Sequence, residues 1–290
     1  MATCYICGSP KNRSICEIPL GTIVRCLECD TVYRAAVVTG DEHNKLYQDE
    51  AMMETPFYLA NKMAVDPKVE PMPTFARGLT RLSKLRTPGR LLDVGCSYGA
   101  FMVLAQTAGW KTLGVELSES VAKFARKERG LDVFTGTVEQ AAYPEGYFDA
   151  VTLWDVIEHL DDPVSTMAEI HRIMAPGGIL IVFTLNQESL LTTVGQMLYK
   201  LSLNRWTHLM ELFYDIHHNF FFSPRTLTGL LKRSEFEVAD VQFGAANVRR
   251  WRIVPISPLM ILGSDVIDFL SRLVRREYRM LVYARKIAKI

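Results

Sequence analysis

Short apolar segments alternate with amphipathic segments through the middle of this chain. Phe75, Leu79 and Leu82 recur at helical spacing within residues 74–86, which predicts a helix. After it the pattern predicts further elements in this order: strand Arg90–Val94, helix Gly99–Ala108, strand Lys111–Leu117, helix Glu119–Arg129, strands Asp132–Thr135 and Phe148–Asp155, helix Pro163–Met174, strand Ile179–Leu185, helix Pro224–Arg233 and strand Glu237–Phe243. Such alternation predicts an α/β fold with a doubly wound, Rossmann-like, mostly parallel sheet. We expect seven strands and place the remaining one near residues 251–256.

Changes in this pattern divide the chain into four parts. Residues 1–40 hold most of the cysteines, and residues 41–73 form a linker with a helical segment, broken by "VDPKVEPMP". Residues 74–250 carry the α/β pattern, interrupted at 187–222 by an apolar, helix-prone insertion that can serve as a lid. Residues 251–290 are expected to form a basic amphipathic, helical C-terminal tail.

Composition narrows the class of protein without identifying it. The 290 residues are 49% hydrophobic and 22% charged, as in folded proteins, and the net charge is +1. This balance provides no general attraction to nucleic acid, so a nucleic-acid partner is not favoured. The first residues lack the apolar core of a signal peptide, and no apolar run is long enough to span a bilayer. We therefore expect a cytoplasmic location.

Four cysteines follow the spacing of a zinc site. Cys4-x-x-Cys7 and Cys26-x-x-Cys29 are separated by a spacer that lies within the range of C-x2-C…C-x2-C zinc modules. With four thiolate ligands the ion has no open position, so a structural Zn²⁺ in a zinc ribbon is expected. Two redox CxxC pairs are the alternative, although a thioredoxin-type pair opens a helix in a βαβ unit. Cys16 is expected to be a free thiol.

The stretch "LLDVGCSYGAF", Leu91 to Phe101, has two interpretations. Gly95 to Gly99 satisfies G-x-S-x-G, in which Ser97 would be a hydrolase nucleophile with Asp155 or Asp215 and a histidine. However, no oxyanion-hole loop precedes this strand. The same letters fit a strand-to-helix loop that holds a nucleotide.

Two carboxylates favour the nucleotide interpretation. Asp93 lies at the carboxyl end of the first strand, and Glu116 ends the second strand, where a carboxylate binds ribose hydroxyls. Ser97 replaces the second glycine of the dinucleotide pattern, and Asp93 would repel a pyrophosphate. A cationic amino-acid ligand would instead be attracted, so Ser97 is predicted to hold a ligand rather than attack one.

Five ordered segments resemble class I S-adenosylmethionine (SAM)-dependent methyltransferases of the ubiquinone-biosynthesis-like branch. They are "LLDVGCSYGAF", "GVELSES", "YFDAVTLWDVIEHLDDP", "APGGILIVFT" and "HHNFFFSPRTLTGLLKRSEFEV", and the resemblance covers residues 75–245. It implies a Rossmann-like fold, SAM as cofactor and methyl transfer. N-terminal zinc ribbons of the "CxxCG…CxxC" kind also occur in this superfamily.

The resemblance assigns a role to each cofactor residue. Asp93, Gly95, Ser97 and Gly99 would contact the methionine part of SAM, and Glu116 the ribose. Leu117 would pack on the adenine, as would the segment at Thr137 and Val138. Family members often have an acidic residue where Thr137 stands, so the contact to the adenine amino group is the weakest match.

Candidate catalytic residues follow the fourth strand and the insertion. Trp154 and Asp155 are expected to flank the methyl group, where an aromatic face suits a sulfonium, although Trp154 is equally compatible with a core position. His218 and His159 are candidate bases for an acceptor proton, and each also has a structural interpretation. Glu158 precedes His159, but adjacent residues on a helix diverge, so no metal pair is expected there.

The sequence identifies the methyl acceptor less specifically than the methyl donor. Residues 264–290 carry seven basic against three acidic residues and an apolar stripe that includes Val266 and Phe269. Such a helix can lie on the inner membrane face, and this position would suit a lipid- or glycan-linked acceptor for O-methylation. Alternatively, the helix can dock on the protein's own core or on a second copy in a homo-oligomer. Two other functions stay open. One is an RNA methyltransferase that uses Arg13, Arg25 and Arg34 of the ribbon with Tyr5 and Tyr33. The other is a non-catalytic scaffold.

Overall fold

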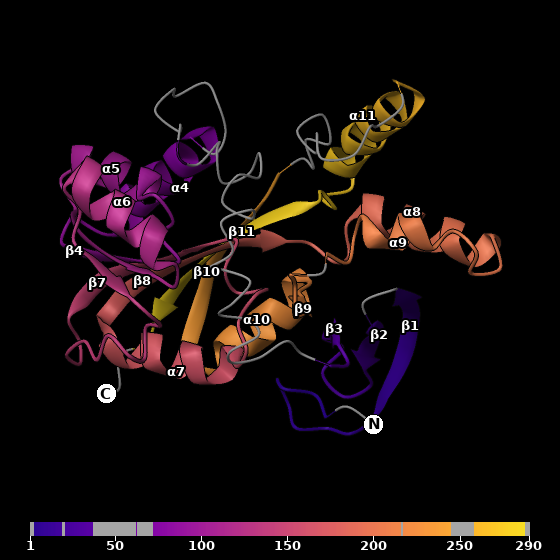
Figure 1. Ribbon diagram of the computed structural model, residues 1–290, viewed down its shortest axis with the longest axis horizontal. Helices are drawn as coiled ribbons and strands as arrows, with labels where there is room; N and C mark the ends of the chain where they lie inside the picture. Colours follow the sequence, from indigo (N-terminus) through magenta and orange to yellow (C-terminus); the bar gives the residue numbers. More distant parts are fainter. Residues whose placement is uncertain are drawn as a thin grey trace.

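Two β-sheets organise the chain in the computed structural model (Figure 1). The structure describes residues 3–18, 21–36, 62, 72–215, 217–244 and 258–287, with the backbone alone at 258–261. Most of the predicted linker and the strand placed near 251–256 lie outside these residues.

The larger sheet has seven strands in the order β10-β11-β8-β7-β4-β5-β6. Its strands are β4 (Arg90–Val94), β5 (Lys111–Glu116), β6 (Val133–Thr135), β7 (Phe148–Trp154), β8 (Met174–Leu185), β10 (Phe236–Gly244) and β11 (Arg279–Lys286). Strand β4 pairs in parallel with both β5 and β7, so the strand order reverses on either side of it. In such sheets the carboxyl ends beside the reversal point bind ligands. This sheet confirms the predicted fold class.

The seventh strand differs from the expected one. Strand β11 runs antiparallel to both neighbours and lies between β8 and β10. The run Met280–Ala284 in this strand is buried and apolar, which is why it enters the sheet instead of extending a helix. Only α11 (Pro258–Leu273) matches the predicted helical tail, so the boundary expected at residue 250 does not mark the end of the α/β domain.

Helices cover both faces of this sheet (Figure 1). Helices α4 (Met72–Leu85), α5 (Ala100–Thr107) and α6 (Glu119–Arg129) lie on one face, and α7 (Pro163–Ile173) and α10 (Pro224–Arg233) on the other. Their sequences carry the expected start signals. The side chain of Asp162 accepts hydrogen bonds from two backbone N–H groups at the start of α7, and Ser223 forms a capping box at the start of α10.

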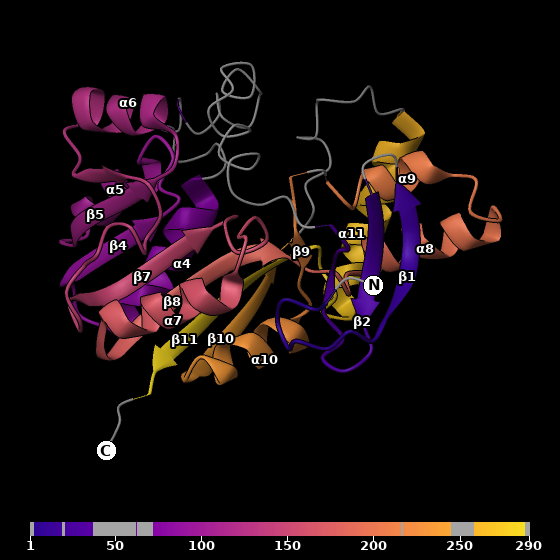
Figure 2. The same ribbon diagram turned by 60° about the horizontal axis from the view of Figure 1, so that its bottom comes forward.

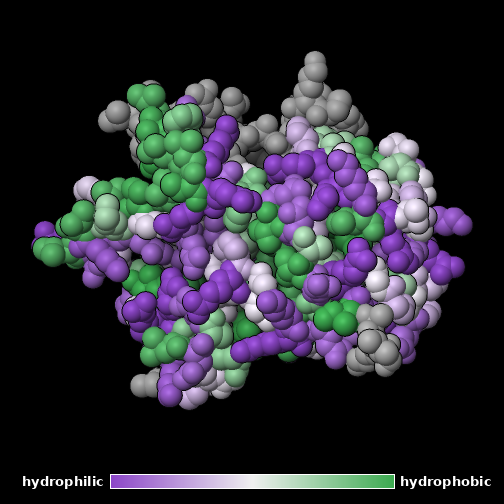
Figure 3. Space-filling view, turned by 180° about the vertical axis from the view of Figure 1, so that it is seen from behind, coloured by the Kyte–Doolittle hydropathy of each residue, from purple (hydrophilic) through white to green (hydrophobic). Residues whose placement is uncertain are grey.

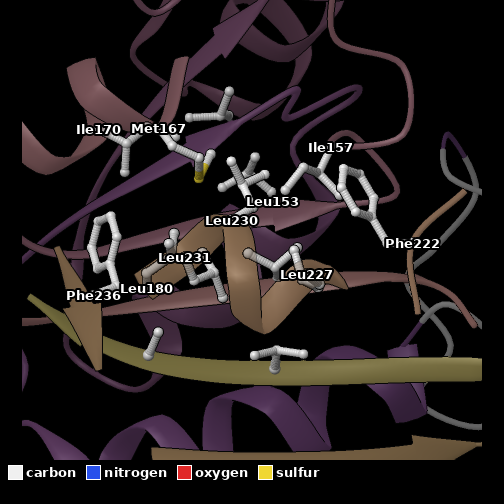
Figure 4. Packing of buried hydrophobic residues seen from close by; sticks show 14 of the residues in the cluster. Leu153, Ile157, Met167, Ile170, Leu180, Phe222, Leu227, Leu230, Leu231 and Phe236 are labelled. Atoms are coloured by element: carbon white, nitrogen blue, oxygen red, sulfur yellow. The ribbon is translucent and has the colours of Figure 1, made fainter. Parts of the chain in front are cut away.

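The largest apolar core lies between the sheet and α7 and α10. Figure 4 shows Leu153 and Leu180 of the sheet facing Met167 of α7 and Leu227 and Leu231 of α10. Each of these side chains is fully buried. At about 1.5–3 kcal/mol per buried aliphatic side chain, this layer is a main source of the domain's stability.

The smaller sheet joins the N-terminal module to the α/β domain. Its order is β1 (Asn12–Ile18), β2 (Gly21–Cys26), β3 (Val32–Arg34) and β9 (Phe220–Phe221). Strand β9 belongs to the predicted 187–222 insertion, whose other elements are α8 (Leu190–Leu201) and α9 (Thr207–Glu211). Figure 2 shows this sheet beside α8, α9 and α11, at the end of the molecule opposite α5 and α6.

Candidate functional site

The loop from β4 to α5 requires glycine at both ends. Gly95 has φ 69° and Gly99 has φ 79°, in the left-handed region that glycine adopts without strain. A Cβ at Gly95 would lie 2.5 Å from Val156, and one at Gly99 would collide with Leu131. The loop therefore turns sharply at the carboxyl end of β4 and leads into α5.

Asp93 and Glu116 are buried carboxylates on neighbouring strands. They are 2% and 8% exposed, and Asp93 Oδ1 accepts a hydrogen bond of 2.6 Å from Thr152 Oγ1. Burial raises the pKa of Asp93 to about 7, an effect that the Thr152 hydrogen bond opposes and the charge of Glu116 reinforces. Burial also raises the pKa of Glu116. Each carboxylate is costly to ionise in the free protein and is stabilised by a cationic or hydrogen-bonding ligand.

Glu116 also holds the glycine loop in place. Its carboxylate accepts hydrogen bonds of 2.9 Å from the backbone N–H groups of Ser97 and Ser118. Ser97 itself has φ 51°, and its buried hydroxyl has no hydrogen-bond partner among the residues that the structure describes. No base is therefore hydrogen-bonded to Ser97 Oγ, and the hydrolase triad is not assembled.

The remaining residues predicted to bind SAM lie directly after strands β5 and β6. Leu117 comes directly after Glu116 and is half-buried, and Val138 is 2% exposed. Thr137 exchanges hydrogen bonds with Gln140. Glu139 turns away from this group, because its carboxylate accepts a hydrogen bond from Thr166 at 2.7 Å.

Trp154 occupies a core position. Its ring lies 4.9 Å from the rings of both Phe75 and Phe101 and 5.9 Å from that of Phe183. A Cβ added to Gly78 of α4 would lie 2.5 Å from the indole, so the helix packs directly on it. Three aromatic rings and α4 therefore pack around the indole, as the core interpretation of Trp154 expects.

Asp155 pairs with an arginine that the sequence did not single out. Arg279, the first residue of β11, donates a short hydrogen bond to Asp155 Oδ1. Burial raises the pKa of Asp155, and the Arg279 charge opposes this shift. The fully buried Glu158 has its pKa raised to about 8 by burial and by the charge of Asp155. The apolar run beginning at Met280 could have indicated a strand, and hence the position of Arg279.

The two candidate histidines come together although 58 residues separate the segments. The rings of His159 and His218 lie 4.6 Å apart, and His159 Nδ1 is 2.8 Å from the carbonyl oxygen of His217. Burial lowers the pKa of His218 well below its usual value, and the charges of His159 and Arg279 lower it further. His218 is therefore a neutral imidazole at physiological pH.

Glu158 and His159 were expected to diverge on a helix and therefore not to form a metal pair. Residues 155–160 form turns instead of a helix, so this expectation was wrong about the local structure. In the turn, ligand atoms of Glu158, His159 and His218 all lie within 4.8 Å of one another.

The ribbon holds the segment that carries His218. Strand β3 pairs with β9, and the backbone N–H of Arg34 donates to the carbonyl oxygen of Asn219 at 2.9 Å. On its other side, the segment donates from the N–H groups of Asn219 and Phe220 to the carbonyl oxygen of Glu158, at 2.8 and 3.0 Å. His218 thus lies between the N-terminal module and the turn after β7.

The four predicted cysteine ligands lie close together, two in the turn before β1 and two at the end of β2 and in the turn after it. Sγ of Cys4 lies 3.6 Å from that of Cys29, and Sγ of Cys7 lies 3.5 Å from that of Cys26. All four sulfur atoms are within 4.8 Å of one another. Thiolates about 2.3 Å from one tetrahedral ion are about 3.8 Å apart, so the cluster fits Zn²⁺.

Most of the ribbon residues considered for RNA binding are engaged in the fold. Tyr33 is fully buried, Arg34 is 3% exposed, and Arg25 forms an ion pair with Asp30 at 3.1 Å. Arg13 alone of the three arginines has an exposed side chain. Among the residues considered for RNA binding, only Arg13 and Tyr5, which is 43% exposed, have exposed side chains.

Comparisons with known proteins agree with this architecture. Residues 71–241 match a family model described as "Methyltransferase domain". Proteins named ubiquinone biosynthesis O-methyltransferase from Xanthomonas oryzae pv. oryzae (strain PXO99A) and Thiobacillus denitrificans are 31% and 35% identical over 161 and 128 residues, covering 52% and 41% of this chain. The matches span 64% and 55% of those relatives.

Solved structures show the same fold. A SAM-dependent methyltransferase from Archaeoglobus fulgidus superposes with a TM-score of 0.52 at 20% identity, covering 79% of this chain and 99% of that one. A geranyl diphosphate methyltransferase superposes with a TM-score of 0.54 at 20% identity, covering 82% and 85%.

Proposed function

We propose that this chain, which belongs to the methyltransferase-domain family and is a SAM-dependent methyltransferase, methylates an oxygen atom of a small or lipid-linked acceptor. The observation that carries the proposal is the pair of buried carboxylates, Asp93 and Glu116, on adjacent strand ends beside the glycine loop. The relatives named as ubiquinone O-methyltransferases support oxygen as the acceptor atom.

The donor site uses the carboxyl ends of β4, β5 and β6. When bound, SAM supplies a methyl group on a positively charged sulfur. Asp93 binds the amino group of the methionine part, which the loop at Gly95, Ser97 and Gly99 surrounds, and Glu116 accepts the ribose hydroxyls. Leu117 and the Thr137–Val138 segment contact the adenine.

The acceptor site uses the turn after β7 and the segment before β9. Asp155 and His159 belong to the turn and His218 to the segment before β9, and the rings of the two histidines lie 4.6 Å apart. An acceptor hydroxyl must lose its proton as its oxygen takes the methyl group. Because the Asp155 carboxylate is paired with Arg279, the histidines are the better placed groups to receive that proton.

Turnover of a panel of acceptors tests this function. The purified protein is incubated with SAM and either a prenylated hydroxybenzene or a polyprenyl-linked sugar, and a product heavier by one methylene is sought by mass spectrometry. Methylation of an oxygen on either acceptor supports the proposal. Binding of S-adenosylhomocysteine (SAH) without methylation of any oxygen acceptor would favour the scaffold alternative.

The affinity for SAH is expected to rise with pH. Asp93 must be ionised to bind the ligand's ammonium group, and its pKa in the free protein is about 7. The dissociation constant should fall about fivefold between about pH 6 and about pH 7, as the ionised fraction rises. Calorimetric titrations across this range measure it. A constant affinity would show that Asp93 does not titrate against the ligand.

The four-cysteine cluster is proposed to bind a structural Zn²⁺. The sulfur geometry supports this. The buried ribbon side chains Ile23 and Val32 pack into a core that the ribbon shares with the 187–222 insertion, so the turns that carry the cysteines need another means of stabilisation. The ion would use Cys4, Cys7, Cys26 and Cys29 and leave no open position.

A lipid-linked acceptor is supported by an exposed apolar surface on α8 and α11, which contact each other. Figure 3 shows apolar side chains gathered over α11 and the end of α8, at the left of the view. The exposed apolar residues are Met197, Leu198, Leu201, Leu203, Trp206, Leu262, Val266, Phe269, Leu270, Leu273 and Val274. Exposed Lys200, Arg205, Arg272 and Arg275 flank them, as expected for contact with an anionic membrane. No described helix is long and apolar enough to cross a bilayer.

Replacing apolar side chains of this surface by carboxylates is expected to release the protein from membranes. Phe269 and Leu273 are 63% and 68% exposed, so Phe269→Asp with Leu273→Asp should reduce co-flotation with phosphatidylglycerol vesicles at least tenfold. Val164→Asp, at an apolar side chain 39% exposed on α7, is the matched control. Equal flotation of the double variant and the control would contradict membrane contact at this surface.

A further inference from the structure

Arg34, the last residue of β3, contacts the histidine segment (residues 215 and 217–219) through both its backbone and its side chain. Its backbone N–H donates to the carbonyl oxygen of Asn219 at 2.9 Å. Its guanidinium donates from Nη2 to the carbonyl oxygen of Asp215 at 3.1 Å. These two acceptors lie on either side of His217 and His218 along the chain. A single ribbon residue therefore holds the histidine segment at both of its ends.

The Asp215 carbonyl oxygen, to which the guanidinium donates, also takes part in the turn that presents His218. The backbone N–H of His218 donates to the same oxygen at 3.1 Å, and the N–H of His217 donates to Asp215 Oδ1 at 2.8 Å. A carbonyl oxygen has two lone pairs, so it can accept from His218 and Arg34 together. The Arg34 side chain thus fixes the carbonyl that closes the turn.

The side chain of Arg34 is buried, which is uncommon for a charged residue. It is 3% exposed, whereas the side chain of Arg13, in the same ribbon, is exposed. Burial lowers the pKa of Arg34, and the charge of Asp215 opposes this shift. Replacing a buried charge by an apolar group of similar volume is often neutral for stability, so we attribute the arginine to the geometry that it fixes.

Strand β9 is too short to fix this geometry by itself. It has two residues, Phe220 and Phe221, and pairs with β3 at the edge of the sheet. On the opposite side the histidine segment contacts the turn after β7. His159 Nδ1 lies 2.8 Å from the His217 carbonyl oxygen, and Asn219 Nδ2 donates to the His159 carbonyl oxygen at 3.2 Å. A shift of the segment would therefore move the imidazoles on both sides of the acceptor site.

We propose that Arg34 is a positioning residue of the acceptor site, which acts through the Asp215 and Asn219 carbonyls to hold His218 against His159. This role rests on the proposed function, in which a histidine receives the acceptor proton. Proton transfer requires the receiving group within hydrogen-bond reach of the acceptor hydroxyl, so a displaced imidazole would lower kcat. The ribbon would thereby complete a site whose other groups belong to the α/β domain.

Arg34→Met and Arg34→Lys in the full-length protein test this role. Methionine keeps an apolar stem and removes the charge and its donors, whereas lysine keeps a charged donor. With a prenylated hydroxybenzene or a polyprenyl-linked sugar as acceptor, kcat should fall at least tenfold in Arg34→Met and clearly less in Arg34→Lys. The KM for SAM, the SAH affinity and the zinc content should stay within twofold of the wild type.

The matched control is Arg25→Met. Arg25 is another arginine of the ribbon, and its ion pair with Asp30 at 3.1 Å lies within the module. This substitution also removes a guanidinium from the ribbon but leaves the contacts to the histidine segment in place. It should retain the wild-type kcat.

Hydrogen exchange of backbone amides measures the order of the histidine segment without an acceptor. The amides of His217 and His218 both donate to Asp215, so their exchange should be at least tenfold faster in Arg34→Met. The same amides should exchange at the wild-type rate in Arg25→Met. The amides of β4 and β5, the strands of Asp93 and Glu116, should be unchanged in both variants.

Three results would overturn the inference. The first is wild-type exchange at His217 and His218 in Arg34→Met, and the second is faster exchange with an unchanged kcat. The third is loss of zinc from Arg34→Met, which would show that the side chain stabilises the ribbon as a whole. A wild-type protein that binds no SAH would instead remove the proposed function, while faster exchange in Arg34→Met would still show that Arg34 holds the segment.

Discussion

Asp93→Asn is expected to weaken the binding of SAM and SAH about 100-fold. Asp93 is 2% exposed and lies beside the glycine loop, with Thr152 as its hydrogen-bond donor. Asparagine keeps the shape and can still accept from Thr152, but it cannot neutralise the ligand's ammonium group. A hydrogen bond to a charged group in a buried site contributes about 1.5–3 kcal/mol, to which the lost charge attraction adds.

The same substitution is expected to stabilise the ligand-free protein at alkaline pH. The pKa of Asp93 is about 7 in the folded protein, against 3.8 for the free side chain. The folded state therefore holds a proton that the unfolded state releases, and stability falls as pH rises through this range. Asparagine does not ionise, so the Tm of Asp93→Asn should exceed that of the wild type by at least ~2 °C at about pH 8.

Calorimetry and thermal unfolding measure the two effects of Asp93→Asn. Asp132→Asn, an exposed carboxylate just before β6, is the control and should change neither quantity. If Asp93→Asn bound SAH with wild-type affinity, this result would contradict the donor site proposed at the end of β4.

Cys26→Ser is expected to remove one equivalent of zinc and to unfold the ribbon. Cys26 is fully buried, and its Sγ lies 3.5 Å from that of Cys7. Serine is a poor ligand for a zinc ion held by thiolates, and the two turns that carry the cysteines depend on the metal to hold them together.

Loss of the ribbon is expected to impair the acceptor site more than the donor site. Strand β3 pairs with β9, next to His218, whereas Asp93 and Glu116 contact no ribbon strand in the sheets. We expect methyl transfer to fall at least tenfold and SAH affinity to change less than threefold. Zinc analysis, calorimetry and product assays measure the three quantities.

Cys16→Ser is the matched control, because Cys16 is a buried cysteine of the ribbon that lies outside the cluster. It should retain the full zinc content and most of the activity. Unchanged turnover in a Cys26→Ser protein that has lost its zinc would show that the ribbon does not position His218.

The proximity of the residues proposed to bind SAM was predictable from the sequence because those residues are local. Asp93, Gly95 and Gly99 lie within one strand, turn and helix start, and the alternation of strands places Glu116 beside them. The cysteine spacing likewise predicted four sulfur atoms that lie within 4.8 Å of one another. In both cases a few consecutive residues determine the geometry.

Several predictions were wrong for the same reason, because they concerned segments whose position depends on pairing or packing with distant parts of the chain. The segment Arg279–Lys286 was assigned to a basic tail because its charges were counted together with those of α11. Its apolar run is a strand that inserts between β8 and β10, and this insertion brings Arg279 to Asp155. Trp154 could not be assigned to the core until α4 was seen to pack on it.

The amino-acid sequence by itself determined the class of fold, the donor loop with its carboxylates and the cysteine cluster, since periodicity and short spacings act along a continuous backbone. Only the tertiary structure decided which distant groups meet: β3 with β9, His159 with His218, and Asp155 with Arg279. These contacts depend on how separate elements pack, and no local pattern records that packing. The acceptor side of this protein is therefore a product of its tertiary structure.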